Sequence, residues 1–169
     1  MIYVFLAQGF EEVEALAPID LLRRCEKEVI TVGVNDNIIV GSHNIPVVTD
    51  TITQEIVLSD ELEMIILPGG MPGTLNLEKS QYVQAAIDFC MEKNIPIGAI
   101  CAAPSILGHK GILKGKTAVC YTGFETQLDG AVIGDTAVAV DGNIITSRGA
   151  GTAMEFALTL VEKAVSEAE

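Results

Sequence analysis

The chain has 169 residues, of which 49% are hydrophobic and 20% charged, and we expect one soluble domain over residues 1–169. The formal net charge of −13 repels polyanions, so nucleic acids and anionic membranes are not expected partners. No apolar stretch approaches the roughly 18 residues of a membrane span. The start of the chain, residues 1–7, is apolar but short and lacks a basic segment. It predicts a first strand rather than an export signal, and hence a cytoplasmic protein.

Strands and helices alternate along the sequence. In chain order we predict a strand at 2–7, a helix at 11–25, a strand at 29–34, a hairpin of 38–40 with 45–48, a strand at 64–67, a helix capped by Ser80 and ending near 94, a strand at 95–100, a short helix ending near Gly108 or Gly111, strands at 118–120, 136–140 and 143–146, and a final helix at 152–164. Pro18 is expected to kink or divide the first helix. Nearly continuous apolar strands between helices predict an α/β fold, with a mainly parallel sheet covered on both faces.

Four cysteines are candidates for reactivity or metal binding. They are Cys25, Cys90, Cys101 and Cys120. None belongs to a C-x-x-C pair, and in a reducing cytoplasm we expect free thiols. His43 and His109 have no cysteine at the spacing of a zinc site, so we expect no metal. Cys25 and Cys90 are predicted to be structural residues on or near apolar helix faces, and so, less firmly, is Cys120 at a strand end.

Cys101 is the predicted nucleophile. It follows the buried strand at 95–100 directly, and the small residues Ala99 and Ala103 stand two positions to either side. A nucleophile elbow requires such neighbours, because its central residue takes a strained conformation in which backbone segments approach closely. A position at the start of a helix is also expected to favour the thiolate. The alternative is a small buried core residue, as free cysteines often are.

A carboxyl group and a pair of glycines follow two other strands. Glu11 and Glu12 are explained by the preference for acidic residues in a first helical turn. Glu14 lies one turn further along the predicted helix, among apolar residues. A carboxyl group held there beside a thiolate would have a raised pKa and could donate a proton. Gly69 and Gly70 end the strand at 64–67 and are expected either to form a turn or, with Ala102, to supply backbone N–H groups to an oxyanion.

Four segments resemble the DJ-one/ThiJ/PfpI family of the class I glutamine-amidotransferase-like superfamily. They are AQGFEEVE (7–14), IILPGG (65–70), AICAAP (99–104) and TSRGAGT (146–152). The resemblance, closest to the ThiJ-like branch, implies a flavodoxin-like three-layer sandwich and a homodimer. It also implies Cys101 as the reactive cysteine, Glu14 as the protonated acid, and Gly69 and Gly70 as part of the oxyanion pocket.

Two positions depart from other branches of this family. Its protease-like branch has histidine directly after the cysteine, where this chain has Ala102, and the Parkinson-disease branch has a histidine where our alignment places Tyr121. His109 is expected to be exposed rather than catalytic. A Cys-His-acid triad is therefore not predicted, nor is peptidase or glutaminase activity. Arg148, in the turn before the last helix, is compatible with an anion site, although a helix-entry turn explains it equally well.

Two functions remain open at this point. The first is a cofactor-free enzyme acting on a small aldehyde or 2-oxoaldehyde, as the resemblance implies through glyoxalase and deglycase activities; methylglyoxal would become lactate by way of the Cys101 thiol and Glu14. The second is an oxidative-stress sensor or chaperone-like protein in which Cys101 is oxidised to sulfinate. Both use the same site. A family member that serves mainly as a binding domain is a third option.

Overall fold

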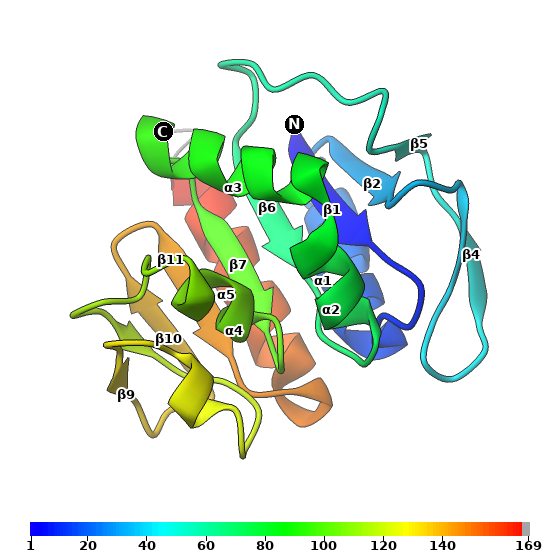
Figure 1. Ribbon diagram of the computed structural model, residues 1–169. Coiled ribbons are helices and arrows are strands. Elements are labelled where there is room, and N and C mark those ends of the chain that lie inside the picture. The colour runs from blue at the N-terminus through cyan, green and yellow to red at the C-terminus, as the bar shows by residue number, and fades with distance from the viewer. Residues whose placement is uncertain (167–169) are drawn as a thin grey trace.

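The computed structural model describes residues 1–166, and its centre is a seven-stranded sheet in the order β10-β11-β7-β6-β1-β2-β5 (Figure 1). The strands are β1 (Ile2–Leu6), β2 (Val29–Gly33), β5 (Thr51–Ile52), β6 (Met64–Leu67), β7 (Ile97–Ile100), β10 (Val138–Asp141) and β11 (Ile144–Ser147). All neighbouring strands are parallel except β10, which runs antiparallel to β11. This confirms the predicted α/β class and the flavodoxin-like arrangement.

The central strands are buried over their whole length because helices cover both faces of the sheet. Every residue of β1, β6, β7 and β11 is buried. The helices α2 (Gly73–Lys79), α3 (Gln81–Lys93) and α4 (Pro104–His109) lie on one face, and α1 (Glu12–Arg24) and α5 (Ala153–Ser166) lie on the other (Figure 1). The core is accordingly split in two, with Phe5 and Leu67 in one part and Leu6 and Phe156 in the other. Continuous apolar strands are the signature of this arrangement.

Local sequence signals set several helix ends as expected. The hydroxyl of Ser80 accepts a hydrogen bond from the N–H of Val83, which caps α3, and Asn94 ends that helix with a φ of 56°. Pro18 does not divide the first helix, which runs without interruption from Glu12 to Arg24. Proline removes only one backbone donor, and α1 packs along α5 on both sides of it.

Smaller elements flank the sheet. β3 (Ile38–Val40) and β4 (Pro46–Val48) form the predicted hairpin. The strand predicted at 118–120 is instead β8 (Thr117–Ala118), which pairs with β9 (Val132–Ile133) in a separate two-stranded sheet. β5 and α2 were not predicted, because two-residue strands and seven-residue helices carry too little periodicity. Two 3₁₀ turns, Glu125–Gln127 and Ala150–Thr152, complete the described elements.

The carboxyl ends of β1, β6 and β7 meet at one edge of the sheet. Three segments that are far apart in the sequence therefore lie side by side: the start of α1, the pair Gly69-Gly70, and Cys101. Within residues 1–166, no helix has the length and apolar character needed to cross a bilayer.

Candidate active site

The backbone of Cys101 has the left-handed conformation predicted for a nucleophile elbow, with a φ of 66°. Its N–H donates to the carbonyl of Ser147 at 3.0 Å, and its own carbonyl accepts from the N–H of Tyr121 at 2.8 Å. Ala99 and Ala103 are fully buried on either side, as the close approach of strand and turn requires. A non-glycine residue in this region is strained by roughly 1–2 kcal/mol, and these two hydrogen bonds hold it there.

The side chain of Cys101 meets Glu14. A Cβ built on Gly69 would lie 2.5 Å from the Cβ of Cys101 and 2.7 Å from Oε2 of Glu14, so the two side chains are immediate neighbours. Glu14 is only 1% exposed. Burial raises the pKa of Glu14 to about 7, while the hydrogen bonds from Cys101 and from the N–H of Gly69 partly offset the effect. The negative charge of Glu11 raises this pKa further. Glu14 therefore changes its protonation state near neutral pH, which is the range where a group that both accepts and donates protons works best.

The thiol of Cys101 is not activated by its position in the fold alone. Burial, followed by the charge of Glu14 and the hydrogen bond to it, raises the pKa of Cys101 to about 12. The N–H groups of Gly70 and Ala102 point at the sulfur and lower the pKa, as expected, but their effect is smaller. α4 begins only at Pro104 and is six residues long. The expectation that a helix start favours the thiolate is therefore wrong for this cysteine, because burial and a facing carboxylate outweigh the N–H groups.

The two glycines have different tasks. The N–H of Gly69 donates to Oε2 of Glu14 at 2.9 Å, so it is already used and holds the carboxyl group in place. A Cβ on Gly69 would lie 2.5 Å from the Cβ of Cys101, so no side chain fits there. Gly70 has a φ of 90°, which directs its N–H toward the sulfur. Of the three expected oxyanion donors, Gly70 and Ala102 face the reactive atom, whereas Gly69 orients the acid.

A cavity of about 310 Å³ opens in front of the thiol. Its lining residues are Glu11, Glu14, Gly70, Met71, Cys101, Ala102, Tyr121, Phe124 and Ala150. The rings of Tyr121 and Phe124 meet edge to face, with centroids 6.4 Å apart. Sequence reasoning assigned no role to Phe124, Met71 or Ala150. The one available signal was Tyr121, the position that the resemblance singled out in the sequence.

The remaining cysteines and His109 lie outside this cavity. All four cysteines are free thiols; Cys90 and Cys120 are buried, whereas Cys25 is exposed at the end of α1. His109 pairs with Glu78 of α2, as expected of a histidine without a catalytic task. The N–H groups of Arg148 and Gly149 donate to the hydroxyl of Thr152, which favours the helix-entry turn over an anion site.

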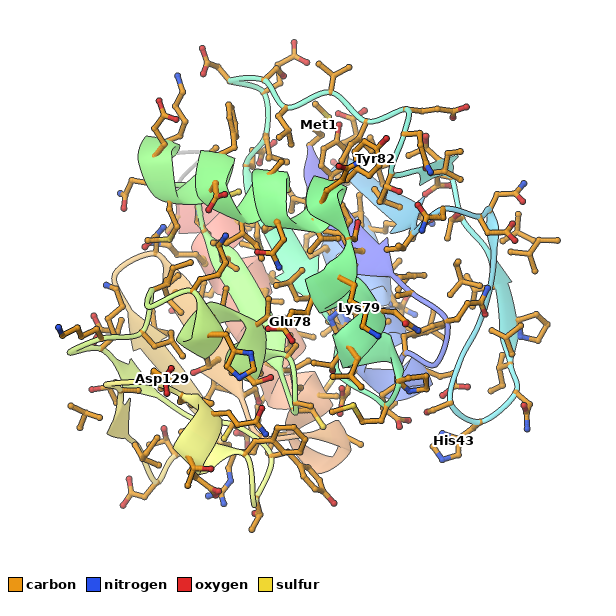
Figure 2. All side chains as sticks on the ribbon, in the orientation of Figure 1. Met1, His43, Glu78, Lys79, Tyr82 and Asp129 are labelled. Carbon is orange, nitrogen blue, oxygen red and sulfur yellow. The ribbon has the colours of Figure 1, made fainter. Side chains whose placement is uncertain are left out.

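Glu11, Glu12 and His43 form an ion-pair cluster beside the cavity, and its potential ligand atoms lie within 4.8 Å of one another. His43 stands at the tip of the β3–β4 hairpin (Figure 2), with Nδ1 3.3 Å from Glu11 and 3.2 Å from Glu12. Oε1 of Glu12 accepts the N–H of His43 at 2.8 Å. The hydrogen bond to Glu12 and the two negative charges raise the pKa of His43. These contacts are those of an ion pair that fastens the hairpin to the start of α1.

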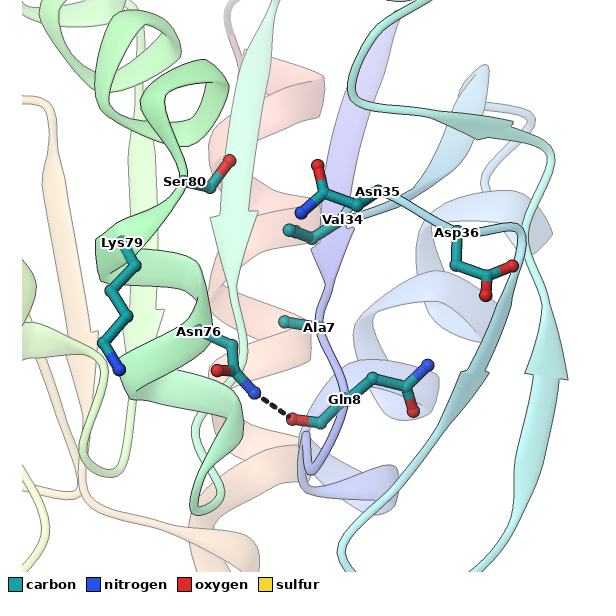
Figure 3. Close-up of a pocket in the computed structure, with 8 residues that line it drawn as sticks. All are labelled: Ala7, Gln8, Val34, Asn35, Asp36, Asn76, Lys79 and Ser80. Carbon is teal, nitrogen blue, oxygen red and sulfur yellow. Dashed lines mark hydrogen bonds between the residues drawn. The ribbon is translucent and has the colours of Figure 1, made fainter.

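A second hollow, of about 490 Å³, lies at the ends of β1 and β2 beside α2 (Figure 3). It is lined by Ala7, Gln8, Val34, Asn35, Asp36, Asn76, Lys79 and Ser80. Several of its polar groups are already paired: Asn76 donates to the carbonyl of Gln8 at 2.8 Å, and Asn35 accepts from Gln54 at 2.9 Å. Its lining contains no cysteine or histidine. The reactive groups are therefore concentrated at the smaller cavity.

Comparison with known proteins agrees with this geometry: residues 1–163 match the DJ-1/PfpI family, and the chain belongs to it. It is 37% identical over 164 residues to the protein DJ-1 homolog B of Arabidopsis thaliana, covering 96% of this chain but only 37% of that longer protein. It is 33% identical over 148 residues to the deglycase PfpI of Pyrococcus furiosus, covering 86% of this chain and 87% of that protein. A crystal structure of a mutant DJ-1 superfamily protein from Salmonella typhimurium superimposes with a TM-score of 0.90 at 33% identity, over 98% of this chain and 90% of that one.

Proposed function

We propose that this protein is an enzyme that uses the thiol of Cys101, with Glu14 as its proton acceptor and donor, on small reactive carbonyl compounds. The observation that carries the proposal is that the two side chains meet beside Gly69 and line the same cavity of about 310 Å³. The relative named a deglycase supports chemistry of this class. The reaction we propose is of the glyoxalase type, in which methylglyoxal and water give lactate.

The first step joins the sulfur to the aldehyde carbon. Cys101 keeps its proton at neutral pH because its pKa is about 12, so Glu14 accepts that proton while the S–C bond forms. The aldehyde oxygen becomes an oxyanion beside the N–H groups of Gly70 and Ala102. Glu14 then returns the proton to this oxygen. The product is a hemithioacetal, and Glu14 is a carboxylate again.

The second step moves a proton between the two carbons. Glu14 takes the proton from the former aldehyde carbon, while the hydroxyl proton passes from the former aldehyde oxygen to the ketone oxygen, which gives an enediolate. Glu14 then delivers its proton to the neighbouring carbon as the carbonyl re-forms beside the sulfur, which gives a thioester of lactate. Water then attacks the thioester carbon, the S–C bond breaks, and lactate and the Cys101 thiol are released. Atoms and electrons balance, because one water is added and no external oxidant or reductant is needed. A group whose pKa lies near 7 suits each of these transfers.

The test is lactate formation from methylglyoxal by the purified chain. We expect Cys101→Ala and Glu14→Gln each to lower kcat/KM by at least about a hundredfold. The matched control is Cys25→Ser, since Cys25 is an exposed thiol outside the cavity, and it should retain full activity. Methylglyoxal consumption undiminished in Cys101→Ala would contradict the proposal.

The second candidate is a sensor in which peroxide oxidises Cys101 to sulfinate. It is favoured by the two N–H groups directed at the sulfur, which would stabilise sulfinate oxygens. The raised pKa of the thiol opposes it, because peroxide reacts with the thiolate. Peptide mass spectrometry after mild peroxide treatment separates the candidates: selective oxidation of Cys101 ahead of exposed Cys25 supports the sensor, and the reverse order excludes it.

The family also suggests an assembly, and we propose that the chain works as a homodimer without a resident metal or cofactor. Sedimentation of the purified chain tests the first part, and a monomer would contradict it. Undiminished turnover after exhaustive dialysis against a chelator is expected for the second part, and loss of turnover would contradict it.

A further inference from the structure

We propose that the cavity in front of Cys101 selects against anionic reagents and substrates, and that Glu11 is the residue responsible. The favoured substrates would be carbonyl compounds with an uncharged, apolar substituent. Compounds that carry a carboxylate or phosphate would be excluded. The statement about substrates rests on the proposed function, whereas the statement about charge concerns the cavity itself and is tested separately.

The lining of the cavity is acidic and apolar. Glu11 and Glu14 are its carboxyl groups, and Met71, Tyr121 and Phe124 provide its apolar walls. Among the described residues, none that lines the cavity carries a positive charge. A substrate with a carboxylate would thus lose its hydration there without gaining a cationic partner, which is unfavourable.

Glu11 is held in position, so it cannot swing away from an incoming anion. Its N–H donates to the carbonyl of Gly69 at 3.0 Å. Oε2 of its side chain accepts from the hydroxyl of Ser42 at 3.1 Å, and Oε1 lies 3.3 Å from Nδ1 of His43. The side chain is only 21% exposed. Its negative charge reaches into the reactive site, because it contributes to the raised pKa of Glu14.

His43 opposes this charge from outside the cavity. Its side chain is 70% exposed at the hairpin tip (Figure 2) and it is not a lining residue. Glu12 shares the same Nδ1, so the cluster remains net negative even when His43 is protonated. On the far side, Arg148 and Glu125 act on the Cys120 thiol with opposite sign. Apart from the reacting pair of Glu14 and Cys101, Glu11 is therefore the charge that a reagent in the cavity meets, and His43 sets how much of this charge is neutralised.

Alkylation of Cys101 tests the charge rule without any turnover. In both reactions the Cys101 thiol gives its proton to Glu14, the sulfur forms an S–C bond, the C–I bond breaks and iodide leaves. Iodoacetamide is neutral, whereas iodoacetate carries one negative charge. Peptide mass spectrometry gives the alkylation rates of Cys101 and of exposed Cys25 in the same sample. For each cysteine, the rate with iodoacetamide is divided by the rate with iodoacetate. The measured quotient is this ratio at Cys101 divided by the ratio at Cys25. We expect a quotient of about ten, which corresponds to about 1.4 kcal/mol of repulsion between the reagent and a unit charge in a partly solvated site. A quotient near one would overturn the proposal.

Two neighbouring substitutions should move this quotient in opposite directions. Glu11→Gln removes the negative charge and should bring the quotient toward one, whereas His43→Gln removes the opposing charge and should raise it. The measurement is made at pH 6.5, where the raised pKa of His43 keeps it mostly protonated. A general loosening of the hairpin would move both variants the same way, and that result would contradict the inference. His109→Gln, at the pair with Glu78 outside the cavity, is the control and should leave the quotient unchanged.

The substrate statement is tested with phenylglyoxal and 4-carboxyphenylglyoxal, which share the reacting group and differ in one remote carboxylate. We expect kcat/KM to favour phenylglyoxal by about tenfold in the wild type and by less in Glu11→Gln. Equal kcat/KM values would overturn the selectivity while leaving the proposed function intact. If methylglyoxal is not turned over either, the proposed function fails, and the alkylation quotient still decides the charge rule. If methylglyoxal alone is turned over, the proposed function stands and the preference for an apolar substituent is overturned.

Discussion

Glu14 on α1 and Cys101 after β7 are neighbours at the carboxyl edge of the sheet, beside Gly69, with Glu14 buried and Cys101 partly buried. The pKa is about 7 for Glu14 and about 12 for Cys101. At pH values between these two, the pair holds one proton. That proton rests on the sulfur, because the thiol has the higher pKa of the two groups. The two groups therefore titrate as a unit, and their pKa values belong to the pair.

The first prediction concerns the pH dependence of turnover. Because Glu14 must be a carboxylate to accept the thiol proton, kcat/KM for methylglyoxal should rise with pH below about 7, by nearly tenfold per pH unit, and level off above it. Steady-state rates between pH 5 and 9 measure this. Any residual activity of Glu14→Gln should lack the inflection near 7. A wild-type profile without a rise in this range would show that Glu14 does not accept the proton.

The second prediction concerns stability. The folded-state pKa of Glu14, about 7, lies above its ordinary value of 4.5, so the folded state binds more protons than the unfolded chain between these values. The contribution of this carboxyl group is therefore most favourable at acid pH and is lost as pH rises to 7, by up to about 3 kcal/mol. Glu14→Gln does not ionise and still offers an oxygen to the N–H of Gly69.

Urea unfolding of the wild type and Glu14→Gln at pH 4.5 and pH 8 isolates this term, since all other titrating groups are common to both chains. The free energy of unfolding of Glu14→Gln, relative to the wild type, should increase between the two pH values. If the difference in free energy of unfolding between the two chains is the same at both pH values, folding does not disfavour the ionised form of Glu14.

The third prediction concerns Gly69. A methyl group there would lie 2.5 Å from the Cβ of Cys101 and 2.7 Å from Oε2 of Glu14, so Gly69→Ala must push the acid and the thiol apart. We expect a loss of about a hundredfold or more in kcat/KM, because proton transfer depends steeply on geometry. Gly151→Ala is the matched control, since a Cβ at Gly151 meets no atom within 4 Å. Similar losses in both variants would refute the assigned role.

The fourth prediction concerns the strain at the elbow. Cys101→Gly and Cys101→Ala both remove the thiol, but only glycine tolerates a φ of 66° without cost. The glycine variant should therefore be more stable than the alanine variant, by up to about 1 kcal/mol once its greater unfolded-state entropy is counted. Ala102→Gly, at a position that does not share the positive φ, should instead be destabilising. Thermal unfolding of the three variants gives the order.

Much of the fold was predictable because its signals are local. The apolar runs at 29–34 and 64–67 became buried parallel strands, and Ser80 and Asn94 bound α3 as their cap preferences indicate. Continuity of α1 through Pro18 was not predictable, because the packing that holds it comes from α5 at the other end of the chain.

For the site, the sequence by itself determined which groups the fold brings together at one cavity: Cys101 between two small residues after a buried strand, Glu14 in the first helix, and the glycine pair. Their chemical state was decided only by the tertiary structure. Burial and the facing carboxylate raise the pKa of Cys101. The N–H of Gly69 donates its hydrogen bond to Glu14, and His43 on a separate hairpin forms an ion pair with Glu11. These effects depend on distances between residues remote in sequence and on the exclusion of water, and no local pattern encodes either.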